Sequence, residues 1–160
     1  MRRVLGTVTL AALCAGVLAA CASREVDWAD AAARAEAFQE ERTGDASLGV
    51  ATTNIGSTES GSEDETVVRM EFPEPVRVDG FTVVCFGDPG SVVFFGYTVR
   101  QGSSWVGGAA AELNCDGAET RVAPATPSER VDAVSVTGQR TAGSGGVLVV
   151  LIDGEDSGGE

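Results

Sequence analysis

The strongest constraint on the fold is a change of periodicity at Thr66. From residue 66 to residue 153, apolar side chains recur at every second position in short runs that turn residues separate. About seven or eight such runs, with turns roughly every eight to twelve residues, are typical of an antiparallel sandwich. The last run, Val147–Ile152, is apolar throughout, as expected for a strand buried on both faces. The sequence therefore predicts an all-β antiparallel sandwich over residues 66–153, with either jelly-roll or immunoglobulin-like connectivity.

Turn residues and prolines predict where individual strands end. Pro73 and Pro75 are expected to end the first strand, and Asp79-Gly80 suits a two-residue hairpin turn. The alternation also predicts a set of inward-facing side chains in the strands that follow: Phe81, Val83, Cys85, Val93, Phe95, Tyr97, Val99, Trp105, Leu113 and Cys115. Both cysteines of this region therefore face the predicted core.

A short helix is expected before the sandwich, over residues 24–42. Its apolar side chains recur at spacings of three and four and share one face: Trp28, Ala31, Ala35 and Phe38. Asp27 or Ser23 is expected to cap its start. Because the apolar stripe is narrow and mostly alanine, this helix needs a docking surface, either the β-domain or the membrane surface.

Two segments look unstructured. Residues 43–65 are rich in Gly, Ser and Thr and end in an acidic run, which predicts a linker, although Leu48, Val50 and Ile55 would allow part of it to pair as an edge strand. Residues 154–160 predict a disordered tail. The acidic residues in both segments suggest cation binding, but they lack the spacing of a calcium loop and are expected to be solvated.

The N-terminus has the features of an export signal. Met1-Arg2-Arg3 is basic, an uncharged apolar run follows, and Leu18-Ala19-Ala20-Cys21 has the pattern of a lipobox. We expect residues 1–20 to be removed and Cys21 to be lipidated, with palmitate among its acyl chains, so that residues 21–42 comprise the anchored N-terminus and the helix. The alternative is an uncleaved transmembrane helix that extends to Ser23.

The four cysteines divide between these features. Cys14 leaves with the signal and Cys21 carries lipid, so Cys85 and Cys115 remain, in an oxidising compartment where disulfides persist. Their spacing excludes a CxxC redox motif, and without histidine they cannot complete a four-ligand zinc site. We expect a structural disulfide that stabilises the fold by roughly 3–4 kcal/mol in the chain-entropy model.

The lipobox, together with the segments Phe81–Gly87 and Leu113–Gly117, resembles small lipoproteins of high-GC Gram-positive bacteria. In those proteins a Cys-x-Gly and a Cys-Asp-Gly-like segment lie in a β-rich domain without an established activity. The resemblance covers the signal and about residues 66–153. It implies attachment to the outer face of the cytoplasmic membrane, and it transfers no catalytic residue.

Composition excludes several chemistries. The chain has no histidine and no lysine, so sites built on a histidine base, a Schiff base or a P-loop lysine are absent. The formal charge is −13. Loss of Arg2 and Arg3 with the signal, which contains no acidic residue, leaves 9 Arg against 24 Asp and Glu, or −15. This charge disfavours nucleic acid as a partner. We expect neither a catalytic site nor a metal or other cofactor.

These observations predict a membrane-anchored, non-catalytic lipoprotein that serves as a binding or scaffold module for an envelope protein or component. The candidate contact residues are Phe86, Phe94 and Trp105, because Phe86 and Phe94 lie opposite the main apolar sets of their strands. The alternative function is a carbohydrate- or calcium-binding module of the cell wall, in which aromatic rings stack on sugars.

Overall fold

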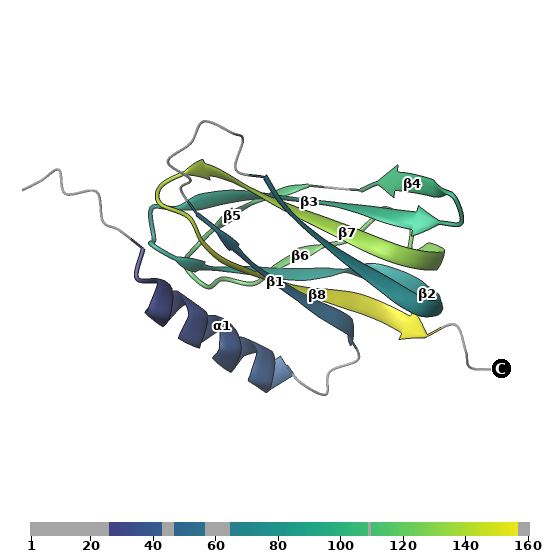
Figure 1. The fold of residues 1–160 in the computed structure, drawn as a ribbon, viewed down its shortest axis with the longest axis horizontal. Helices are drawn as coiled ribbons and strands as arrows, with labels where there is room; N and C mark the ends of the chain where they lie inside the picture. Colours follow the sequence, from purple (N-terminus) through teal and green to yellow (C-terminus); the bar gives the residue numbers. More distant parts are fainter. Residues whose placement is uncertain (1–25, 43–46, 57–64, 109, 157–160) are drawn as a thin grey trace, which may run out of the picture.

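The computed structural model describes residues 26–42, 47–56, 65–108 and 110–156. Within these ranges the chain forms a β-sandwich with a helix on one outer face (Figure 1). The elements in chain order are α1 (Trp28–Arg42), β1 (Ser47–Ile55), β2 (Glu65–Gly87), β3 (Val92–Gln101), β4 (Ser104–Gly107), β5 (Ala111–Asn114), β6 (Thr120–Val122), β7 (Ser128–Ala142) and β8 (Gly146–Asp156). The lipobox, Cys21 and the predicted signal lie outside the described residues.

The strand order is β1-β8-β2-β7-β3-β4, with β5 paired to β3 and β6 paired to β2, and all pairs are antiparallel. The long strand β2 belongs to both layers of the sandwich. Its first part, Glu65–Glu71, pairs with β7, whereas Val76–Gly87 pairs with β8. We call the layer of β7, β3, β4, β5 and the first part of β2 the β3 sheet, and the layer of β1, β8, β6 and the second part of β2 the β8 sheet. The predicted antiparallel sandwich is confirmed.

The main core lies between the two sheets. Phe81 of β2 contacts Tyr97 and Phe95 of β3, with ring centroids 4.2 and 6.0 Å apart. The predicted alternation holds through most of this core, whose members include Phe81, Val83, Cys85, Val93, Phe95, Tyr97, Val99, Leu113 and Cys115. As predicted, Val147–Ile152 is buried on both faces, because the core covers one side and α1 covers part of the other.

Strand β2 differs most from the prediction. It runs unbroken through Pro73, Pro75 and Asp79-Gly80, so the predicted strand end and hairpin turn are both wrong. The register instead shifts between Val78 and Gly80, which marks a bulge. An extra residue in one strand reverses the alternation. For that reason Val78 before the bulge and Phe81 after it both face the core.

The predicted linker and tail are also partly strand. Ser47–Ile55, inside the predicted linker 43–65, forms β1 and pairs with β8, so the edge-strand alternative is correct for these residues. Ile55 is fully buried. Removal of its apolar side chain from water stabilises the fold, and a residue in a solvated linker makes no such contribution. At the other end β8 extends to Asp156, because Gly154–Asp156 pairs with Val76–Val78. The predicted tail is therefore wrong for residues 154–156, and residues 157–160 lie outside the described part.

Helix α1 docks on the outer face of the β8 sheet. Asp27 Oδ1 accepts a hydrogen bond from the backbone N–H of Asp30 at 3.1 Å, which caps the helix as predicted. A second apolar cluster joins the helix to the sheet; its members are Val26, Ala31, Ala35, Phe38, Val84, Phe86, Val147 and Val149. The β-domain is therefore the docking surface that this alanine-rich helix requires. In the part of the chain that the structure describes, no helix has the length and apolar content needed to span a bilayer.

Candidate binding face

The outer face of the β3 sheet is free of the helix and carries the exposed aromatic residues of the sandwich. Figure 1 shows α1 beside β1 and β8, on the opposite side of the molecule from β3, β7 and β4. The strand registers place one set of outward residues side by side, which we call the Trp105 face: Val67, Arg69 and Glu71 of β2; Ser135, Thr137 and Gln139 of β7; Phe94, Gly96, Thr98 and Arg100 of β3; and Trp105 of β4.

Trp105 lies at one edge of this face. It is on the edge strand β4 directly opposite Arg100, and the residue is 40% exposed. The Cζ atom of Arg69 lies 4.9 Å from the centroid of the indole, and that of Arg100 lies 5.9 Å away. Guanidinium groups at these distances are attracted to the electron-rich ring face. The two arginines therefore hold the indole in place while part of it stays in contact with solvent.

The contact between Arg69 and Trp105 shows that both side chains lie down along the sheet. Strands β7 and β3 separate β2 from β4, so about three strand spacings of 4.8 Å, or roughly 14 Å, lie between the two backbones. The side chains meet only by reaching toward each other across the intervening strands. Ala133 and Ser135 of β7 are in register with residues of β2 and β3 on this face, so they lie between Arg69 and Trp105. Both are buried, although they do not belong to the main core. The contact between Arg69 and Trp105 therefore covers this part of β7.

An ion pair completes the charged part of the face. Arg100 Nη1 donates a hydrogen bond to Glu71 Oε1 at 3.3 Å, across Ala133 of β7, with which both residues are in register. An exposed pair of this kind contributes little to stability. Its effect is to leave donor and acceptor groups side by side next to an aromatic ring.

The far half of the face is less polar. Phe94 is 39% exposed, and Val67 is more exposed still. Gly96 lies between Phe94 and Thr98 on β3, and a Cβ atom added there would come within 2.9 Å of Thr137 Oγ1. The absence of a side chain at Gly96 therefore leaves the Thr137 hydroxyl uncovered between the two ends of the face.

The three predicted contact residues do not form one surface. Trp105 and Phe94 are exposed on the Trp105 face, but Trp105 does not face inward with Leu113 and Cys115 as the alternation predicted, because β4 and β5 are separate strands. Phe86 is only 6% exposed and lies under α1 on the opposite sheet. Its inclusion in a contact surface is therefore wrong. It points away from the main core, as predicted, but a second apolar layer covers it.

Sequence reasoning missed the arginines of this site. Neither Arg69 nor Arg100 was among the predicted contact residues. Arg69 is 36 positions from Trp105 in the sequence, and the two meet only because β2 and β4 lie in the same sheet. The exposed tryptophan itself was a usable signal. Its partners depended on the strand order, which the sequence did not reveal.

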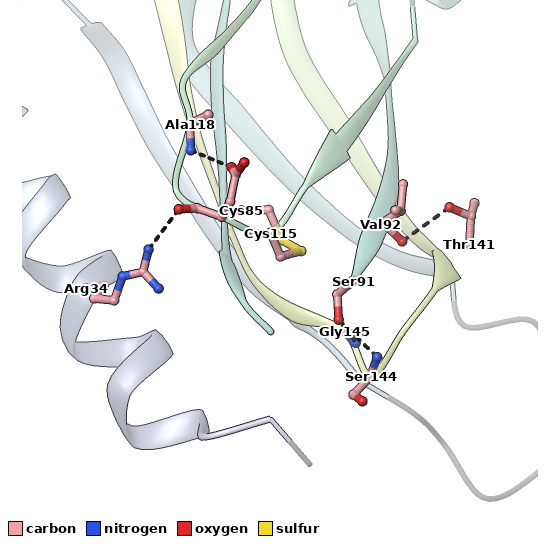
Figure 2. The surroundings of a disulfide bond; sticks show 10 residues. Arg34, Cys85, Ser91, Val92, Cys115, Ala118, Thr141, Ser144 and Gly145 are labelled. Carbon is pink, nitrogen blue, oxygen red and sulfur yellow. Dashed lines mark hydrogen bonds between the residues drawn. A yellow bond between two sulfur atoms is a disulfide. The ribbon is translucent and has the colours of Figure 1, made fainter. Parts of the chain in front are cut away.

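The disulfide lies at one end of the sandwich, away from this face. Cys85 and Cys115 are bonded with their Cα atoms 4.3 Å apart, as predicted, and both are fully buried. Figure 2 shows that Arg34 of α1 approaches the same region and that the buried Ser91 lies nearby. Among the described residues no group of three or more acidic, cysteine or histidine side chains is placed to hold a metal ion.

Comparisons with known proteins give only a weak likeness of fold. No protein-family model matches the chain, and no curated protein matches it. Among solved structures, the chain is similar to one described as TmCBM61 in complex with β-1,4-galactotriose, with 12% identity and a TM-score of 0.30. The match covers 71% of this chain and 90% of the other. Such a likeness is too weak to identify a family or a ligand.

Proposed function

We propose that the chain is a lipid-anchored, non-catalytic binding module of the cell envelope, and that the Trp105 face is its ligand-binding surface. The observation that carries this proposal is the partly exposed Trp105, with the guanidinium groups of Arg69 and Arg100 over its ring, on a sheet face that the helix does not cover. Tryptophan and arginine are among the residues that contribute most to binding energy at interfaces.

The position of α1 supports the anchored arrangement. Only six residues separate Cys21 from Trp28, and fully extended they reach about 20 Å. A lipidated Cys21 would therefore keep α1, and the β8 sheet on which it packs, close to the bilayer. The Trp105 face lies on the other side of the sandwich. An anchored protein would thus present this face away from the membrane, toward the wall or the medium.

The anchor is tested by mass spectrometry of the exported chain. We expect a mature N-terminus at Cys21 that carries acyl chains, and we expect the Cys21→Ser variant to be released from the membrane fraction. Because stable attachment needs more than one acyl chain, loss of the whole lipid group should abolish attachment to the membrane. An exported chain that still begins at Met1, or a Cys21→Ser variant that stays membrane-bound, would contradict the proposal.

The binding surface is tested with the full-length chain in detergent, mixed with a preparation of cell envelope material. We expect Trp105→Ala to reduce retention on this material strongly. Trp28→Ala is the matched control, because Trp28 has nearly the same exposure, 38%, but lies on α1 at the opposite side. Equal retention of the wild type and Trp105→Ala would show that the Trp105 face is not the binding surface.

A further inference from the structure

The chemistry of the Trp105 face narrows the class of ligand that it can bind. We infer that this ligand is an uncharged glycan, with one sugar ring stacked on Trp105 and neighbouring hydroxyl groups bound by Arg69, Arg100 and Glu71. The inference rests on the proposed function, since it names the ligand class of the same surface. Three features of the face support it: its shape, its charge balance and the way its apolar groups are distributed.

The shape suits a sugar ring. The guanidinium groups of Arg69 and Arg100 lie over the indole of Trp105, and part of the residue stays open to solvent. A pyranose ring exposes C–H groups on its faces and hydroxyl groups around its edge. The C–H face can pack on the indole, where removal of apolar surface from water is favourable. The edge hydroxyls then reach the polar groups that surround the ring.

The charge balance favours an uncharged ligand. Among the residues whose side chains the structure describes, the face and its neighbouring strand β5 carry two arginines, Arg69 and Arg100, and two glutamates, Glu71 and Glu112. Glu112 pairs with Phe94. These charges cancel, although the whole chain has a formal charge of −13. An anionic ligand would be repelled by the chain as a whole, and a cationic one would meet the two guanidinium groups. A hydroxyl group both donates and accepts, so it complements guanidinium and carboxylate groups placed side by side.

The distribution of apolar groups disfavours a protein partner. Protein interfaces are enriched in Trp and Arg, but their apolar core is depleted in Glu and is bordered by a polar rim. Here Glu71 is paired with Arg100 beside the tryptophan, and Gly96, Thr98 and Thr137 separate Trp105 from Phe94. Phe94 and Arg100 are six residues apart on the same side of β3, which corresponds to about 20 Å. Alternating apolar and hydroxyl-binding positions over that length fit an extended chain of sugars.

The experiment uses the full-length chain in detergent and a defined panel of oligosaccharides. The uncharged probes are oligomers of at least three sugars built from β-linked galactose, glucose, mannose or xylose, and oligogalacturonate is the charged probe. We expect at least one uncharged probe to bind. We expect Trp105→Ala to weaken that binding at least tenfold, which corresponds to about 1.4 kcal/mol. Trp28→Ala should bind as the wild type does.

Three further measurements distinguish glycan binding from a purely structural role of Trp105 and Arg69. Trp105→Phe keeps an aromatic surface and should retain part of the affinity, whereas Arg69→Gln should lose affinity without loss of folded structure by circular dichroism. The affinity for an uncharged probe should change little between about 0.1 and 1 M salt, a range in which the Debye length falls from roughly 10 to 3 Å. A strong salt dependence, or no effect of Arg69→Gln, would contradict the inference.

The failure of this inference is distinct from the failure of the proposed function. Periodate treatment of the envelope material destroys sugars with vicinal hydroxyls, and protease treatment destroys proteins. If Trp105-dependent retention survives periodate and is lost after protease, the ligand is a protein; the inference is then wrong while the proposed function stands. Tighter binding of oligogalacturonate than of every uncharged probe would overturn the inference in the same way. If retention does not depend on Trp105, both proposals fall.

Discussion

The guanidinium group of Arg34 lies over the ring of Phe86, with its Cζ atom 5.0 Å from the ring centroid. The same side chain donates a hydrogen bond from Nη2 to the carbonyl oxygen of Asp116 at 3.1 Å, as Figure 2 illustrates beside the disulfide. Helix α1 is therefore attached both to the outer face of β2 and to the loop that follows Cys115. This attachment turns Phe86, a residue on the outward side of its strand, into a buried one.

The two phenylalanines predicted as contact residues should respond very differently to truncation. Phe86→Ala removes a buried ring that packs against Phe38, so we expect a loss of about 3–5 kcal/mol in the free energy of unfolding. Phe94→Ala removes a ring that is 39% exposed and should cost far less. Chemical denaturation measures both. Equal losses would mean that α1 does not cover Phe86 in solution.

Loss of the disulfide should destabilise the protein without removing the β-domain's topology. The bond joins residues 30 positions apart, so its removal should lower the free energy of unfolding by about 3–4 kcal/mol in the chain-entropy model. The double variant Cys85→Ser with Cys115→Ser should show this loss in urea denaturation. Reduction of the wild type should give a similar value. A double variant as stable as the oxidised wild type would contradict the assignment of a structural role.

Ser91 should be necessary for the β7–β8 turn. Its side chain is fully buried, and its Oγ atom accepts hydrogen bonds from the backbone N–H groups of Ser144 and Gly145, both at 3.0 Å. Ser91→Ala leaves these donors without that acceptor, at a cost of about 1–3 kcal/mol for a buried group. Thermal unfolding compared with the exposed control Ser104→Ala tests this. Similar melting temperatures for the two variants would contradict the assigned role.

The parts of the fold that the sequence predicted well depend on local periodicity. The inward set Val93, Phe95, Tyr97 and Val99 and the buried run Val147–Ile152 could be read directly, because burial on one or both faces determines which positions are apolar. Ala31 and Ala35 were likewise placed on the docking face of the helix by their spacing. In each case the signal lies within about ten residues of the chain.

The features that were mispredicted depend on partners far away in the sequence. An Asp-Gly pair suits both a hairpin turn and a bulge, and at Asp79-Gly80 the long pairing of β2 with β8 selects the bulge. The same β8 strand supplies the partner that makes residues 47–55 a strand rather than a linker. The Trp105 face also depends on residues far apart in the sequence, because Arg69 and Trp105 come together only through the strand order.

Alanine substitutions at Gly145 and Gly102 distinguish the stability cost of a left-handed backbone conformation from the cost of steric crowding. Both have positive φ, +96° and +60°, so alanine at either position adopts a left-handed conformation that costs about 1–2 kcal/mol. A Cβ atom at Gly102 would meet nothing within 4 Å, whereas at Gly145 it would collide with the carbonyl oxygen of Ile55, the last residue of β1. We therefore expect Gly145→Ala to lose about 2–5 kcal/mol in total, because overpacking adds to the conformational cost.

The collision at Gly145 also predicts where the damage appears. Ile55 pairs with Gly146, so relief of the clash must displace the end of β1 from β8. Amide hydrogen exchange of the Gly145→Ala variant should therefore accelerate in Ser47–Ile55 before it accelerates in β3 or β7, while Gly102→Ala leaves β1 protected. Equal stability losses for the two variants, or uniform exchange across all strands, would show that β1 does not pack against this turn. Because β1 lies beside the helix-bearing face, Gly145→Ala should leave binding at Trp105 unchanged.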